Sequence, residues 1–206
     1  MSYSSLPDPD QLQRTMEAVK ACGIKVELVE TKEAALARLQ ALIPAGAVVM
    51  TGGSVTLTQI GFDALLISGN HAWRNFKADL LAEKDPAKQL VLRLQGTQAE
   101  YFLGSVNAIS ETGELVFASA TGSQLPAYSF TSRNIIWVAG AQKIAATLDE
   151  AFRRVREYVL PMEDERQKNA GNKNGTFIGK ILIMEREPAY LRRNLTLILV
   201  NEVLGF

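Results

Sequence analysis

A glycine-rich turn at residues 51–57, Thr-Gly-Gly-Ser-Val-Thr-Leu, is the first candidate for chemistry in this sequence. It follows a short apolar run, which is typical of a buried parallel strand, and we expect a helix after it. Gly52 and Gly53 let backbone N–H groups converge on an anion, and the hydroxyls of Ser54 and Thr56 can add donors. The turn matches neither the dinucleotide-binding nor the ATP-binding glycine pattern. It therefore predicts a site for a phosphate or carboxylate or, alternatively, only a tight strand-to-helix turn.

The segment Ser-Val-Asn-Ala-Ile-Ser at 105–110, which contains Asn107, is the second candidate, because it follows an expected strand at 100–103. Loops beyond the carboxyl ends of strands are where open α/β sheets bind ligands. The amide of Asn107 could orient a carboxylate or a carbonyl group. The alternative is that Asn107 only satisfies the backbone of a turn, since Glu-Thr-Gly-Glu at 111–114 is typical of a hairpin. Both interpretations stay open.

A second polar turn, Thr-Gly-Ser-Gln at 121–124, is the third candidate. We expect it to lead into a short helix. Gly122, Ser123 and Gln124 could line the same cleft as the first turn if the strands that precede the two turns are neighbours.

Lys143 is the fourth candidate and the only one with a charge. It follows the apolar strand 135–139 directly and is the only basic residue between Arg133 and Arg153. A lysine in this place could supply a point charge to an anion or, if desolvated, a nucleophilic or basic amine. Gln142 beside it could polarise a carbonyl group. The alternative is an ordinary surface lysine.

Composition excludes several kinds of site. The chain of 206 residues has one histidine, His71, and one cysteine, Cys22, which cannot form an intramolecular disulfide, a Cys/His zinc site or a four-cysteine iron–sulfur site. His71 lies in a turn without an identifiable carboxylate or nucleophile partner, so we interpret it as a structural residue. We expect no bound metal and no cofactor.

Charge and hydropathy suggest where the protein acts. Lys and Arg number 22 and Asp and Glu number 22, so there is no general electrostatic attraction for nucleic acid or for an anionic membrane. No apolar stretch approaches the ~20 residues that a membrane helix needs, and the N-terminus lacks the features of a secretory signal. We expect a cytoplasmic protein that binds neither nucleic acid nor membrane.

Periodicity predicts an α/β fold in a single domain, with a largely parallel sheet flanked by helices. The stretch 101–148 carries few charges, as expected for a sheet covered on both faces. We expect an N-terminal extension at 1–9, a mobile loop at 168–176, and Arg153, Arg154 and Arg156 on the solvated face of a helix that Pro161 ends. The expected helices are 8–22, 31–43, 63–68, 73–82, 86–94 and 149–159, and the expected strands are 24–30, 47–50, 100–103, 107–110, 114–118, 134–138, 178–184 and 195–200.

Five segments together resemble the LUD (lactate utilization, formerly DUF162) domain family. The segments are 52–57 with Gly61, 100–110 with 113–116, 120–126, 138–144 with 148–151, and 197–206. Each motif is weak alone, but their order and spacing are fairly specific, and they cover most of the chain. The resemblance implies one LUD domain over 1–206.

The resemblance also implies a fold like that of ribose-5-phosphate isomerase, glucosamine-6-phosphate deaminase and the CoA transferases. It implies a link to bacterial oxidation of L-lactate to pyruvate, where LUD proteins work beside iron–sulfur partner subunits. Two features depart from the family. Many members have Gly-Asn-Arg where this chain has Gly-Ser-Gln at 122–124, and many short relatives have cysteines in the region that corresponds to 169–183, where this chain has none. Cluster binding therefore cannot be transferred to this chain.

We therefore hypothesise a small subunit or accessory protein of L-lactate oxidation that binds a small anionic metabolite in these loops. In this hypothesis Lys143 is the candidate catalytic residue, and iron–sulfur partners or a homo-oligomer are open alternatives for its assembly. A different hypothesis is a stand-alone enzyme of the sugar-phosphate isomerase or acyl-CoA-handling type. An isomerase would need a carboxylate base, for which the nearest candidates are Glu100, Glu111 and Glu114.

Overall fold

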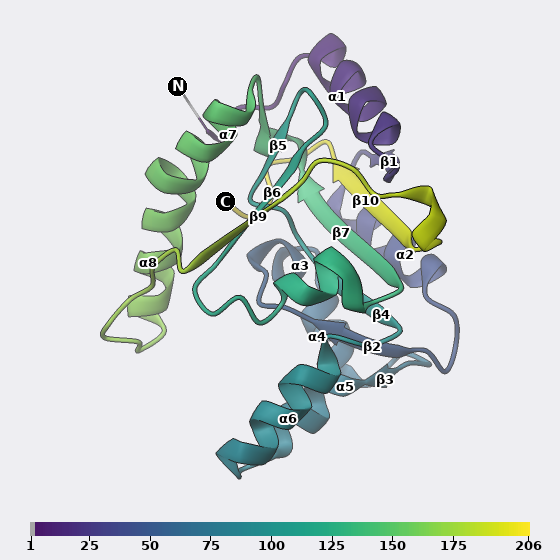
Figure 1. The fold of residues 1–206 in the computed structure, drawn as a ribbon, viewed down its shortest axis with the longest axis vertical. Coiled ribbons are helices and arrows are strands. Elements are labelled where there is room, and N and C mark those ends of the chain that lie inside the picture. Colours follow the sequence, from purple (N-terminus) through teal and green to yellow (C-terminus); the bar gives the residue numbers. More distant parts are fainter. Residues whose placement is uncertain (1–2) are drawn as a thin grey trace.

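A computed structural model describes residues 3–206 and contains two β-sheets packed between helices (Figure 1). The larger sheet has six strands, all parallel, and the smaller sheet has four. In spatial order, the larger sheet consists of β1 (Lys25–Val29), β10 (Asn194–Val200), β7 (Asn134–Gly140), β4 (Tyr101–Gly104), β2 (Val48–Thr51) and β3 (Arg74–Asn75). The smaller sheet consists of β8 (Ile144–Ala145), β5 (Ala108–Ser110), β6 (Leu115–Ser119) and β9 (Lys180–Met184). The predicted α/β fold is confirmed.

Helices cover the outer faces of both sheets. The helices are α1 (Pro9–Ala21), α2 (Lys32–Leu42), α3 (Val55–Gln59), α4 (Phe62–Ser68), α5 (Phe76–Ala82), α6 (Pro86–Gly96), α7 (Leu148–Arg154) and α8 (Leu160–Asn169). Helices α2, α3 and α4 pack on one face of the larger sheet, while α1 and the smaller sheet pack on its other face. Helix α7 covers the outer face of the smaller sheet, and α5 and α6 extend from the lower end of the molecule in Figure 1.

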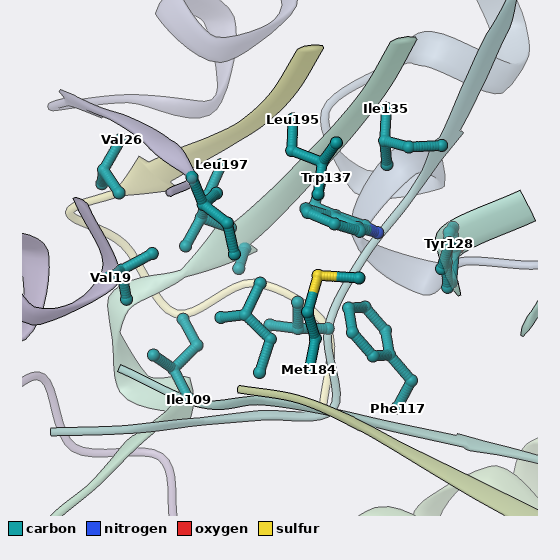
Figure 2. Packing of buried hydrophobic residues seen from close by; sticks show 14 of the residues in the cluster. Val19, Val26, Ile109, Phe117, Tyr128, Ile135, Trp137, Met184, Leu195 and Leu197 are labelled. Atoms are coloured by element: carbon teal, nitrogen blue, oxygen red, sulfur yellow. The ribbon is translucent and has the colours of Figure 1, made fainter. Parts of the chain in front are cut away.

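The strand β7 shows how the sequence builds these layers. Its side chains alternate, so that Trp137 faces the smaller sheet while Ile136 and Val138 face α2, α3 and α4. Between the sheets, Trp137 meets Phe117 of β6 and Met184 of β9 (Figure 2). The ring centroids of Trp137 and Phe117 are 5.2 Å apart. This packing fixes the smaller sheet against the larger one and with it the two chain crossovers between them, at 105–107 and 141–143.

The predicted helix starts are confirmed at two caps. The side chain of Asp8 accepts a hydrogen bond from the backbone N–H of Gln11, and that of Thr31 accepts one from Ala34. Helix α1 ends before Gly23, whose φ of 86° suits a residue without a side chain.

The prediction that Pro161 ends a helix is wrong. A π-turn, η3 (Val155–Val159), joins α7 to α8, and Pro161 lies in the first turn of α8. The wider π-turn interrupts the regular hydrogen-bond ladder, so the missing N–H of Pro161 costs little there. As a result, 168 and 169 of the expected loop belong to α8.

Two further expectations need correction. Residues 74 and 75, expected in a helix, form β3. One sheet was expected, but the last two strands lie in different sheets, since β9 pairs with β6 and β10 lies between β1 and β7. Apolar periodicity identifies a strand but does not report its partner, so the second sheet was not predictable from it.

Of the expected N-terminal extension, Met1 and Ser2 lie outside the described residues, and Pro9 already belongs to α1. Within residues 3–206, no helix combines the length and the apolar character needed to span a bilayer.

Candidate functional site

The carboxyl ends of β2, β4, β7 and β10 meet at one edge of the larger sheet, beside a cavity of about 430 Å³. This is the edge where open α/β sheets bind ligands. The side of the cavity nearest the sheet is formed by the glycine-rich turn after β2, the crossover after β4, the turn η2 (Ala141–Lys143) after β7 and the segment 204–206. Of the residues expected in a site, the cavity is lined by Gly53, Ser54, Thr56, Asn107, Ser123, Gln124 and Lys143.

Lys143 is the buried charge of this cavity, since only 2% of the residue is exposed. Its amine donates hydrogen bonds to Thr56 Oγ1 at 3.1 Å, Ser105 Oγ at 3.0 Å and the carbonyl oxygen of Val106 at 3.1 Å. No carboxylate of the described residues forms an ion pair with it. Burial, assisted by the positive charge of Arg154, lowers the pKa of the Lys143 amine to about 7. The surface-lysine alternative is therefore wrong.

Arg154 is a second buried cation, with 1% of the residue exposed. Its guanidinium donates to the carbonyl oxygen of Asn107 and lies over the ring of Tyr158, 5.3 Å from the centroid. Nε and Nη2 have no hydrogen-bond partner, and among residues 3–206 no carboxylate pairs with the group. Burial lowers the pKa of Arg154 to about 10. Arg154 does not line the cavity, but its charge acts on Lys143, so two buried cations without a carboxylate partner among the described residues influence each other.

Arg154 is a functional candidate that the sequence analysis missed, because it was expected on a solvated helix face. It lies three residues after buried Ala151 and directly before buried Val155, so it belongs to the packed side of α7. The spacing from Ala151 was a usable signal. Ser105 was also missed as an individual candidate, although it follows β4 directly.

Asn107 has a structural role, and its role toward a ligand stays a prediction. Its Oδ1 accepts a hydrogen bond from the backbone N–H of Ala118 at 2.7 Å, which is the structural role. Its Nδ2 has no hydrogen-bond partner among the described residues, while the residue lines the cavity. One half of the amide therefore fixes the smaller sheet, and the other half can serve a ligand.

The two polar turns lie side by side, although the strands that precede them are not neighbours, because β2 belongs to the larger sheet and β6 to the smaller one. A Cβ atom on Gly52 would lie 2.7 Å from Oε1 of Gln124, so the close approach depends on glycine. Gly52 itself lines a smaller adjoining cavity of about 140 Å³. Ser54 Oγ accepts from the N–H of Leu57 and caps α3, which leaves the hydroxyl proton free to point elsewhere.

Besides Gly52, two expected residues do not line the larger cavity. Gly122, with φ of 80°, packs against the stem of Lys180. Gln142 is buried and clamps the final segment of the chain, because its Nε2 donates to the carbonyl oxygen of Leu204 at 2.9 Å and its Oε1 accepts from the N–H of Leu204. Gln142 therefore holds the segment 204–206 over Lys143 and does not face the cavity.

The positions of the carboxylates do not favour an isomerase, which would need one of them as a base in the cavity. Glu100, Glu111 and Glu114 are absent from the cavity lining. The two carboxylates that do line it are already engaged, since Asp63 accepts from Thr58 Oγ1 and Glu163 accepts from Arg166 and Gln167. Within residues 3–206, no three His, Cys, Asp or Glu side chains gather closely enough to hold a metal ion.

His71 has the structural role expected of it. Its ring stacks on Trp73 with centroids 5.1 Å apart, and Nδ1 accepts a hydrogen bond from the backbone N–H of Trp73. It does not line the cavity.

The fold and the cavity define an α/β protein with a polar ligand-sized cavity at the carboxyl edge of a parallel sheet. The sequence matches the LUD domain family over residues 12–185, and the chain therefore belongs to that family. Among solved structures, the fold is similar to the crystal structure of a DUF162 family protein from Deinococcus radiodurans, with 15% sequence identity and a TM-score of 0.55. The match covers 96% of this chain and 100% of that one, and at this identity it concerns the fold alone. No curated protein matches the sequence.

Proposed function

We propose that this LUD domain protein takes part in lactate utilization by binding a small anionic metabolite, a carboxylate or a phosphate, in the cavity beside Lys143. Membership of the family supports the link to lactate. The observation that carries the binding site is the buried amine of Lys143, which faces the cavity and has no carboxylate partner among the described residues.

Burying a cation without a counter-ion costs free energy. An unpaired buried amine is disfavoured in its charged form, which is why the pKa of Lys143 falls to about 7. An anion beside it would restore the missing counter-charge and favour the protonated amine. Arg154, also without a carboxylate partner within residues 3–206, adds positive potential at Lys143. Hydroxyls of Thr56 and Ser105 and Nδ2 of Asn107 can supply polar contacts.

The size of the cavity sets limits on the ligand. A volume of about 430 Å³ falls within the range of ordinary small-molecule sites. A three-carbon acid such as lactate fills only part of it. The candidate ligands therefore include phosphate-bearing metabolites and acyl thioesters as well as lactate and pyruvate.

Thermal unfolding with a panel of anions tests this function. The probes are L-lactate, pyruvate, inorganic phosphate, ribose 5-phosphate and acetyl-CoA, because a ligand that binds only the folded state raises the melting temperature. We expect at least one to do so in the wild type and not in Lys143→Met. Lys173→Met, in an exposed loop, is the matched control and should respond like the wild type. No shift with any probe, or equal shifts in Lys143→Met, would contradict the proposal.

A second candidate function is a non-catalytic subunit that docks on an iron–sulfur partner. It is favoured by four large apolar side chains on α5 and α6, each more than half exposed: Leu81, Leu90, Val91 and Leu94. Exposed apolar patches of this kind mark interaction sites. The test is co-purification of the native protein, compared with a Leu90→Glu and Leu94→Glu double variant. Recovery of the same partners with both proteins would count against docking through this surface.

A further inference from the structure

We propose that the amine of Lys143 forms an imine with the carbonyl carbon of a 2-oxo acid bound in the cavity. The inference rests on the proposed function and deepens it, because it assigns covalent chemistry and a substrate class to the same site. Three features of the geometry carry it: the amine lines the cavity, two hydroxyls contact it, and no carboxylate within residues 3–206 pairs with it.

The hydrogen-bond partners of Lys143, which can accept three N–H groups from a protonated amine, also accommodate a neutral amine. A neutral amine offers two N–H donors and one lone pair, whereas the carbonyl oxygen of Val106 can only accept. One N–H is therefore directed to Val106, and a hydroxyl can either accept the second N–H or donate to the lone pair. Thr56 and Ser105 provide two such hydroxyls, at 3.1 and 3.0 Å. A carboxylate in either place would instead favour a permanently protonated lysine.

The reaction balances in atoms and electrons. The lone pair of Nζ attacks the carbonyl carbon and forms a C–N bond, while the π electron pair moves to the carbonyl oxygen, which takes up a proton. The resulting carbinolamine loses that oxygen as water, and the nitrogen lone pair forms the C=N double bond. The amine and the ketone give the imine and one water, with no change in oxidation state. The reaction is reversible and needs no co-reactant.

The nitrogen must release two protons in all, and the oxygen must gain two before water leaves. Ser105 Oγ lies 3.0 Å from Nζ and 3.3 Å from Thr56 Oγ1, so the two hydroxyls form a continuous path beside the amine. Hydroxyl groups both donate and accept, which lets them relay these protons. We assign Ser105 as the relay group that contacts the reacting nitrogen most closely.

The titration of Lys143 agrees with this chemistry. With a pKa of about 7, the amine is present in both forms near neutral pH. The protonated form attracts the carboxylate of the 2-oxo acid, and the neutral form attacks its carbonyl carbon.

The competing chemistry at this site is acyl transfer to Ser105, with Lys143 as its base. A serine nucleophile needs donors for the oxyanion that develops beside it. The nearby backbone N–H of Asn107 is not available for this purpose, because it donates to the carbonyl oxygen of Val116 at 2.9 Å. The geometry therefore favours the imine.

Reductive trapping tests the imine directly. The wild-type protein is treated with pyruvate and borohydride, digested, and its lysine peptides are quantified by mass spectrometry. We expect the reduced pyruvate adduct on Lys143 and none with L-lactate, which lacks a carbonyl. At saturating pyruvate, trapping should increase as pH rises through 7, because the neutral amine is the nucleophile. Ser105→Ala should slow trapping about tenfold or more while Lys143 remains the modified residue. Lys173→Arg should behave like the wild type.

The outcomes separate this inference from the proposed function. If pyruvate raises the melting temperature but borohydride leaves Lys143 unmodified, the imine is wrong and the anion site stands. The imine is also wrong if the reduced adduct is found only on exposed lysines, or if the total amount of adduct is the same in Lys143→Arg as in the wild type. If pyruvate and the other anions neither stabilise nor modify the protein, both proposals fail. Peptide mapping uses the wild type, so the result does not depend on how well a variant folds.

Discussion

The two edges of the larger sheet bury basic side chains in opposite ways. At the amino edge, before β10, Arg193 Nε lies 3.1 Å from Oε1 of Glu187, and both side chains are about 5% exposed. Arg193 also donates to the carbonyl oxygen of Tyr128 at 2.6 Å. At the carboxyl edge, Lys143 and Arg154 are equally buried, and within residues 3–206 neither has a carboxylate partner. The same sheet therefore compensates its buried charge at one edge and leaves it uncompensated at the other.

This difference follows the division of roles in a parallel sheet. At the amino edge, α1 and the turn η1 (Ala127–Thr131) are tied to the segment between β9 and β10. Arg193 donates to Tyr128 of η1, and the backbone N–H of Glu187 donates to the carbonyl oxygen of Cys22, directly after α1. The carboxyl edge is where such sheets bind ligands. An uncompensated cation lowers stability and is a candidate for function, whereas a paired one only has to hold the structure.

The largest expected effect is at the amino edge. Glu187→Gln leaves Arg193 buried without a counter-charge, which typically costs about 3–5 kcal/mol of the free energy of unfolding. Chemical denaturation at pH 7 measures it. The matched control is Asp79→Asn, which breaks the exposed pair with Arg74 and should cost about 1 kcal/mol or less. If the two variants lost the same free energy of unfolding, the buried pair of Glu187 and Arg193 would stabilise the protein no more than an exposed pair does. The distinction between the edges would then be lost.

At the carboxyl edge we expect the opposite sign, because Lys143→Met removes a charge that folding must desolvate. Lowering the pKa of this amine from 10.5 to about 7 corresponds to a penalty on the order of 4 kcal/mol at neutral pH. Loss of its three hydrogen bonds offsets part of that gain, at about 1 kcal/mol each. The variant should therefore be roughly 1 kcal/mol more stable than the wild type at pH 7.

The pH dependence of that difference is the sharper measurement. Between pH 7 and 10.5 the unfolded chain holds a proton on Lys143 that the native protein has lost, so wild-type stability rises with pH relative to the variant. The advantage of Lys143→Met should shrink as pH rises and reverse before about pH 10. A difference that stays constant from pH 7 to 10 would show that the amine is not desolvated in the native state.

A third prediction concerns binding at the same edge. L-lactate keeps its charge above pH 7, whereas Lys143 loses its proton there. Affinity for L-lactate should therefore fall with rising pH, approaching tenfold per pH unit, and binding should take up about half a proton at pH 7 and more at higher pH. Calorimetry in two buffers of different ionisation enthalpy measures this uptake. Lys143→Arg, which stays protonated, should bind without it, and identical uptake in this variant would exclude Lys143 as its source.

The contrast between the edges also explains how far the sequence could be interpreted. The caps at Asp8 and Thr31 and the central apolar strands depend on local pattern, and they were predicted correctly. Lys143 was identified because it is an isolated charge after a strand. The pairing of Glu187 with Arg193 was not predicted, because it depends on how the segment between β9 and β10 folds back, which no local pattern encodes.

The misassignment of Arg154 has a related cause. Arg153, Arg154 and Arg156 were assigned together to one solvated face, whereas Arg154 lies one turn after buried Ala151 on the packed side of α7. The role of Gln142 was likewise missed, because its partner Leu204 is 62 residues away in the sequence. In the candidate site, local pattern therefore identified the polar turns and the lysine, while the second cation and the clamp required the tertiary structure.

The smallest expected effects, on stability and on L-lactate affinity, come from substituting the two adjacent glycines of the first turn. A Cβ on Gly53 would meet no atom within 4 Å, and the residue lines the larger cavity. Gly53→Ala should therefore change stability by less than about 0.5 kcal/mol while its methyl group occupies ligand space. We expect weaker L-lactate binding, by roughly 1 kcal/mol or about fivefold, measured by calorimetry.

Gly52→Ala is the matched variant, because its Cβ would be directed at Oε1 of Gln124 and not into the larger cavity. Gln124 has a flexible side chain that can move away, so stability should again change little. Binding should weaken only if Gln124 contacts the ligand from its present position. Unchanged affinity in Gly53→Ala would mean that the ligand does not reach the turn and is held by the amine and the hydroxyls near Lys143 alone.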